Sequence, residues 1–132
     1  MKRDYETGID TNTIFLEVTV GTPATATTIV FLTLPGLDPE VIAESGNSNG
    51  NIPETPIGKA GKIRNGFLRI ETTVDLGTLP ESTWPAATEK LVVTYVLNGG
   101  TSGRDEFTFD PDDRKISNNG KIIAIGKPIK LT

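Results

Sequence analysis

The chain has 132 residues, a formal net charge of −4, and neither cysteine nor histidine. The missing cysteines exclude disulfides and thiol nucleophiles, and the missing histidines exclude the commonest general base and zinc ligand. The acidic balance argues against a nucleic-acid partner, because phosphate binding needs clustered Lys and Arg. The length predicts a single domain. No apolar run reaches the ~18–20 residues that span a bilayer, and no signal-peptide core follows Met1, so membrane insertion is not expected.

The first half of the chain carries two strand signals. Apolar and polar residues alternate over positions 14–20, which is typical of a strand with one buried face. Residues 27–34 contain a continuous apolar run, which predicts a central strand covered on both faces. Residues 1–12 precede these strands and are predicted to form an extended N-terminal arm.

A short helix and a long loop are expected next. Residues 38–45 fit a helix of barely two turns, with Asp38 as N-cap, Pro39 at the first helical position and Gly46 as the stop. The following residues, 46–61, are rich in Asn, Gly and Pro and have no period. They predict a long exposed loop, and loops of that length are usually functional or disordered.

The cleanest alternation in the chain lies within residues 62–76, which predict a long strand. Residues 77–88, which contain two prolines and the single tryptophan, are expected to form a second loop. Apolar and polar residues alternate again over residues 89–97, and the same two-residue spacing recurs at Phe107 and Phe109. These two segments should therefore pair as a hairpin.

Near the C-terminus, residues 122–125 predict a short buried strand. The sequence Gly126-Lys127-Pro128 is expected to break it before a last segment at residues 129–131. Proline at this point suggests an edge strand. Strands separated by turns, with no strand–helix alternation, predict an all-β protein: an antiparallel β-sandwich of immunoglobulin-like or jelly-roll type with at most one short helix.

The acidic turn after the predicted hairpin is a candidate metal site. Asp110, Asp112 and Asp113 could offer carboxylates to calcium, which takes six to eight oxygen ligands. No complete calcium-binding loop motif is present, and Asp with Pro is also ordinary turn chemistry, so a solvated turn is the favoured interpretation. No other cofactor is expected.

The single tryptophan is the candidate ligand or partner contact. Trp84, with Glu81 and Tyr95, could form a stacking platform for a sugar or an anchor in a protein interface. A tryptophan that closes one end of the core is the commoner outcome, and sugar sites normally need several aromatic residues. Glu71 and Asp75, on one strand face, could pair with another acid for glycoside hydrolysis, but a small sandwich rarely supplies the required cleft.

These observations favour a non-enzymatic structural or interaction domain. The first hypothesis is a self-assembling component of a particle or surface structure, of the virion, phage decoration or tail type, whose partners are copies of itself or other subunits. The alternative is an extracellular or cell-surface module that binds carbohydrate or protein. The sequence contains no nucleotide-binding glycine motif and no N-glycosylation motif.

Overall fold

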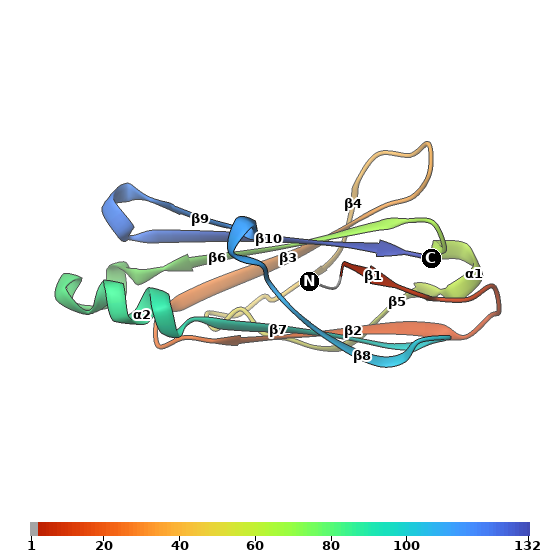
Figure 1. Ribbon diagram of the computed structural model, residues 1–132, viewed down its shortest axis with the longest axis horizontal. Helices are drawn as coiled ribbons and strands as arrows, with labels where there is room; N and C mark the ends of the chain where they lie inside the picture. Colours follow the sequence, from red (N-terminus) through yellow and green to blue (C-terminus); the bar gives the residue numbers. More distant parts are fainter. Residues whose placement is uncertain (1–2) are drawn as a thin grey trace.

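A computed structural model describes residues 3–132 and shows two β-sheets packed face to face (Figure 1). Sheet A contains, in order, β1 (Asp4–Tyr5), β10 (Ile122–Leu131), β6 (Phe67–Asp75), β3 (Thr25–Thr33) and β4 (Glu40–Glu44), and β9 (Arg114–Ser117) also pairs with β10. Sheet B contains β5 (Ile52–Lys59), β2 (Thr13–Gly21), β7 (Val92–Gly100) and β8 (Gly103–Thr108). All pairings are antiparallel except β1 with β10, so the predicted antiparallel sandwich is confirmed as an all-β fold.

Alternating side chains build the core between the sheets. In β2 the residues Ile14, Leu16, Val18 and Val20 are buried, and in β6 the even-numbered positions from Leu68 to Val74 are buried in the same way. The buried apolar side chains of both sheets form one cluster. The hairpin predicted from Phe107 is also present, because β7 pairs with β8 and Tyr95 stands opposite Phe107.

The continuous apolar run in β3 behaves differently from the prediction. The strand is central, since it lies between β6 and β4, but only one of its faces is covered. Val30 and Leu32 are buried in the core, whereas Ile29 and Phe31 are only partly buried on the outer face. An apolar run therefore does not always mark a strand covered on both sides.

Two expectations in the middle of the chain are wrong. The helix predicted at residues 38–45 is the edge strand β4, because an isolated helix of two turns is unstable and pairing with β3 supplies hydrogen bonds. The loop predicted at residues 46–61 is shorter, since β5 occupies half of that range and the short helix α1 (Ala60–Ile63) begins at its end. β5 is an edge strand with register irregularities, which is where prolines are tolerated.

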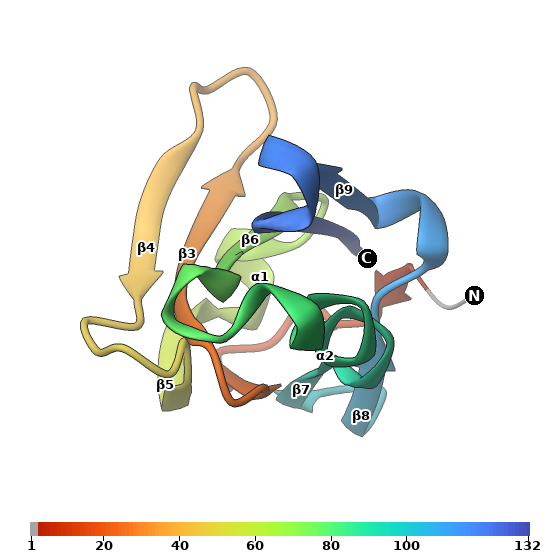
Figure 2. The same ribbon diagram turned by 90° about the vertical axis from the view of Figure 1, so that its left-hand side faces the viewer.

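Residues 77–88 are not an irregular loop. They contain the 3₁₀ turns η1 (Leu76–Thr78) and η2 (Glu81–Thr83) and the start of helix α2 (Trp84–Lys90). A proline in the first turn suits a helix start, and Ala86 and Ala87 favour its interior. Helix α2 lies at one end of the sandwich and α1 at the other (Figure 1), and Figure 2 looks onto the α2 end.

The N-terminal segment is not a free arm over the part that the structure describes. β1 runs parallel to the end of β10, and the side chain of Tyr5 is fully buried. Its hydroxyl donates to Gly103 O at 2.6 Å and accepts from Gly100 N–H at 2.8 Å, so the N-terminal segment is tied to the β7–β8 turn. Residues 1 and 2 of the predicted arm lie outside the described residues.

Candidate functional site

The outer edge of β10 is covered in two places and open between them. β9 pairs with Ile122–Ile125 and β1 pairs with Lys130 and Leu131, so positions 126–129 have no strand neighbour on that side. The N–H of Lys130 donates to Arg3 O at 2.8 Å, which means that the nitrogen of Pro128, two residues earlier, also faces this edge. Proline is tolerated here because no strand requires its missing N–H, and β10 continues through the predicted break.

Two aspartates from another part of the chain meet an arginine at this open edge. Asp110 precedes and Asp113 ends the 3₁₀ turn η3 (Pro111–Asp113), which connects sheet B to β9, and Arg3 lies just before β1. Arg3 Nη2 is 2.7 Å from Asp110 Oδ2 and 3.3 Å from Asp113 Oδ1. Asp113 Oδ2 also accepts the backbone N–H of Asp110 at 2.8 Å, which fixes the turn.

The fourth charged residue is Lys127, whose side chain points into the sandwich. It lies in phase with Ile123, Ile125 and Ile129 on the interior face of β10, and its exposed fraction is 0%. Its Nζ is 3.8 Å from Asp110 Oδ2. Arg3, Asp110, Asp113 and Lys127 are called the charged cluster below, and its two cations and two carboxylates balance to no net charge.

The Asp110 carboxylate is held mainly by charge. Its side chain is only 8% exposed, and the cations near its Oδ2 are Arg3 Nη2 at 2.7 Å and Lys127 Nζ at 3.8 Å. Since an ion pair inside a protein must offset a large loss of hydration, a buried carboxylate depends strongly on its nearby cations. Arg3 and Lys127 are the two cations that offset the burial of the Asp110 side chain.

Tyr95 lies within the electrostatic reach of this cluster. It is fully buried on β7, and its hydroxyl has no hydrogen-bond partner among the described residues. Burial, and to a smaller extent the negative charge of Asp113, raises the pKa of Tyr95 well above its ordinary value. Tyr95 is therefore a neutral side chain inside the sandwich and is not exposed for contact at the surface.

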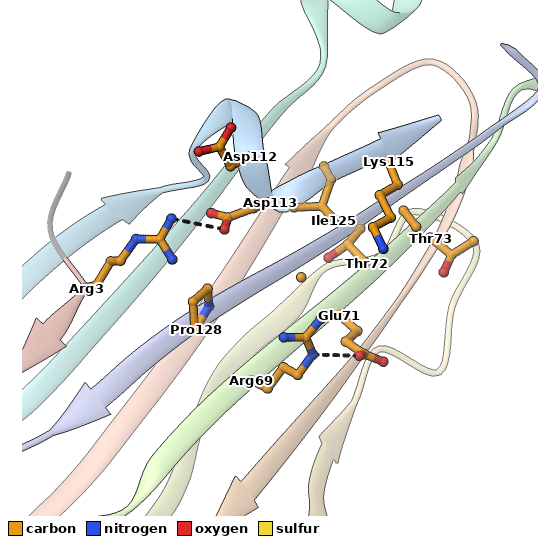
Figure 3. A pocket seen from close by; sticks show the side chains of 12 residues that line it. Arg3, Arg69, Glu71, Thr72, Thr73, Asp112, Asp113, Lys115, Ile125 and Pro128 are labelled. Atoms are coloured by element: carbon orange, nitrogen blue, oxygen red, sulfur yellow. Dashed lines mark hydrogen bonds and ion pairs between the residues drawn. The ribbon is translucent and has the colours of Figure 1, made fainter. Parts of the chain in front are cut away.

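A hollow of about 390 Å³ lies outside the charged cluster (Figure 3). Arg3, Asp113 and Lys115 line one side of it, and Arg69 and Glu71 of β6 line the other. Arg69 Nε donates to Glu71 Oε1 at 2.8 Å. Gly126 leaves room for the Arg69 side chain in this position, because a Cβ at residue 126 would lie 2.5 Å from Arg69 Nη2.

The geometry gives no support to the calcium prediction. The described residues contain no group of three or more acidic side chains placed to hold a metal ion. Asp110 and Asp113 face Arg3, while Asp112 is exposed on the turn. Of the three predicted aspartates, the structure therefore brings Asp110 and Asp113 together at Arg3 and leaves Asp112 in solvent.

Trp84 and Glu81 share a different location, at the α2 end of the sandwich. They line a hollow of about 430 Å³ together with Ile116 of β9. Trp84 is partly buried against the core, and its Nε1 donates to Leu79 O at 3.1 Å. The structure brings these two predicted contact residues together, but it does not bring Tyr95 to them, because Tyr95 is buried inside the sandwich.

The outer face of sheet A carries an apolar surface that the sequence did not single out. Val41 and Phe67 are 46% and 43% exposed. Phe31 pairs in register with Val41, and Phe31, Pro39 and Phe67 line one hollow of about 390 Å³ beside Arg69. These four residues, Phe31, Pro39, Val41 and Phe67, are called the outer apolar patch.

No protein-family model, curated protein or solved structure matches the chain. Within residues 3–132, no helix has both the length and the apolar character needed to cross a bilayer.

Proposed function

We propose that this protein is a non-enzymatic structural domain that assembles with copies of itself, as a subunit of a particle or surface structure. The observation that carries the proposal is the outer apolar patch, where Val41 and Phe67 are nearly half exposed beside Phe31. Large apolar side chains gathered on one face are typical of protein interaction sites. Aromatic anchors in such a patch supply much of the binding energy of an interface.

The charges around the outer apolar patch favour a second copy as the occupant. Arg69 and Glu71 lie beside it on β6 with exposed side chains. In a two-fold dimer, each residue of one copy can meet its complement in the other, so Arg69 of one copy can pair with Glu71 of its partner. The patch therefore suits self-association through the face of sheet A.

The neighbouring edge of β4 is less suitable for pairing. If two β4 strands aligned antiparallel around Ile42, Glu40 of each copy would stand opposite Glu44 of the other. Like charges in directly opposed positions destabilise a strand pair. Contact through the face and not through this edge is therefore the arrangement that we propose.

Light scattering across protein concentration tests the proposal. We expect the native chain to form a defined oligomer, and Phe67→Ser to shift it toward the monomer. Val92→Ser is the matched control, because Val92 is 55% exposed on sheet B, away from the patch.

A native chain that stays monomeric at every concentration would contradict the proposal. The alternative would then be favoured, an extracellular module that binds carbohydrate or protein. The hollow that Trp84 and Glu81 line is the specific observation behind that alternative. A glycan and partner screen followed by Trp84 fluorescence would test it, with loss of binding in Trp84→Ala as the expected result.

A further inference from the structure

The interior of the sandwich holds a primary amine beside a carboxyl group. Lys127 Nζ and Asp110 Oδ2 are 3.8 Å apart, and the two side chains are 0% and 8% exposed. The two residues come from different elements, because Lys127 lies on β10 and Asp110 precedes the turn η3. Bulk water is therefore excluded from a pair of groups that can react with each other.

We propose that Lys127 and Asp110 condense into an intramolecular amide bond, so that β10 is covalently joined to the turn η3. The bond forms between Lys127 Nζ and Asp110 Cγ, and one C–O bond of Asp110 breaks. Of the three ammonium hydrogens, one stays on the new amide nitrogen and two leave with the carboxyl oxygen as water. Starting from the ion pair, atoms and charge balance without an oxidant or another reactant.

The other two members of the charged cluster have positions that suit this reaction. Arg3 Nη2, 2.7 Å from Asp110 Oδ2, can stabilise the negative charge that develops on oxygen when nitrogen attacks Cγ. Asp113 Oδ2 is bound to the backbone N–H of Asp110, so its carboxylate lies next to the reacting group. In the proposed reaction this carboxylate is the base that takes up a proton released by the lysine and returns it to the departing oxygen.

The charge balance of the cluster favours the product. Before the reaction, three buried charged groups, Lys127, Asp110 and Asp113, lie beside the partly exposed Arg3, which is costly because the buried groups have lost hydration. Condensation removes the charges of Lys127 and Asp110 and leaves Arg3 with Asp113, which are already 3.3 Å apart. Arg3 and Asp113, which would remain as an ion pair, also line the hollow described above (Figure 3).

Such a bond would also reinforce a stretch of sheet A that has an open edge. Positions 126–129 of β10 have no strand neighbour on their outer side, and the turn η3 contacts β10. A covalent link from Lys127 would hold the turn and the crossover to β9 in place when the sandwich is strained. This property suits a subunit of an assembled structure.

Intact-mass measurement of the full chain in denaturant tests the proposal. The expected mass is that of the sequence minus one water, after allowance for removal of Met1. Lys127→Met keeps a buried side chain of similar length but has no amine, and it should show the full sequence mass. This control also separates the amide from a cyclised aspartate, which would lose water in both proteins.

Digestion with trypsin locates the bond. Cleavage after Arg104, Arg114, Lys121 and Lys130 releases residues 105–114 and 122–130, and in the native chain these two peptides should stay joined. Asp113→Asn should slow the loss of water without preventing the chain from folding. A native chain that has the full sequence mass, both when fresh and after long incubation, would overturn the proposal and leave an ordinary ion pair.

Discussion

Sheet A buries two polar pairs on its interior face, and they are built in different ways. The first pair is Thr28 and Thr72, whose hydroxyl oxygens are 3.0 Å apart on the adjacent strands β3 and β6. The second pair is Lys127 and Asp110, which needs Arg3 and Asp113 around it and draws on three separate segments of the chain. The neutral pair is local, whereas the charged pair depends on the whole fold.

This difference teaches what each pair contributes. Strand register alone places Thr28 opposite Thr72, and each hydroxyl satisfies the other, so the pair resembles a cross-strand contact. The charged cluster instead joins the N-terminal segment and the turn η3 to β10, where no strand covers the edge. Removing one partner should therefore be much more harmful in the charged cluster than in the threonine pair.

The largest effect is expected from Asp110→Ala. The substitution leaves Lys127 buried without this carboxylate and also removes the closest partner of Arg3. Breaking a buried ion pair from one side typically costs ~3–5 kcal/mol of unfolding free energy. Denaturant unfolding monitored by circular dichroism measures this loss.

Asp112→Ala is the matched control for that experiment. Asp112 lies in the same turn but is exposed, and exposed substitutions usually change stability by no more than ~0.5 kcal/mol. Equal and small effects of the two substitutions would show that the charged cluster does not hold the turn.

A smaller effect is expected from Thr72→Val. The substitution keeps the shape of the side chain but leaves the buried hydroxyl of Thr28 without its partner, at a cost of ~1–3 kcal/mol. Thr28→Val together with Thr72→Val should recover much of this loss, because both hydroxyls are then gone. A double-mutant cycle measures the recovery, and simple additivity of the two single effects would contradict the pairing.

The sequence predicted the fold where apolar and polar residues alternate strictly. β2, β6 and β7 were found in this way, because a strand with one buried face leaves a period of two in its residues. The prediction failed at residues 38–45, where local helix signals competed with pairing to β3. A pattern within one segment cannot show which neighbour will supply its hydrogen bonds.

The sequence indicated only two of the four residues of the charged cluster. The turn from Asp110 to Asp113 was noticed, but Arg3 is about a hundred positions away and nothing local links it to them. Lys127 was missed because Gly126 and Pro128 suggested a break, although Lys127 shares the phase of Ile125 and Ile129. A prediction that the strand continues through Pro128 would have placed Lys127 on the buried face with Ile125 and Ile129.

Tyr95 extends the comparison to a buried polar group that has no partner. Its hydroxyl lacks a hydrogen bond among the described residues, so Tyr95→Phe should leave stability unchanged or raise it by about 1 kcal/mol. Because burial raises the pKa of Tyr95 above 10.0, the folded state keeps the proton after the unfolded state has lost it. The native protein should therefore lose stability as the pH rises above about 10.

The same substitution separates Tyr95 from the other groups that titrate in alkaline solution. Tyr95→Phe should lose less stability than the native chain between neutral and alkaline pH, when unfolding free energies are compared by denaturant titration. Tyr5, whose pKa is raised mainly by burial, still contributes to both proteins, so some alkaline sensitivity should remain. Identical pH profiles for the two proteins would mean that the hydroxyl of Tyr95 reaches water, and that this part of the interior is less closed than the threonine pair.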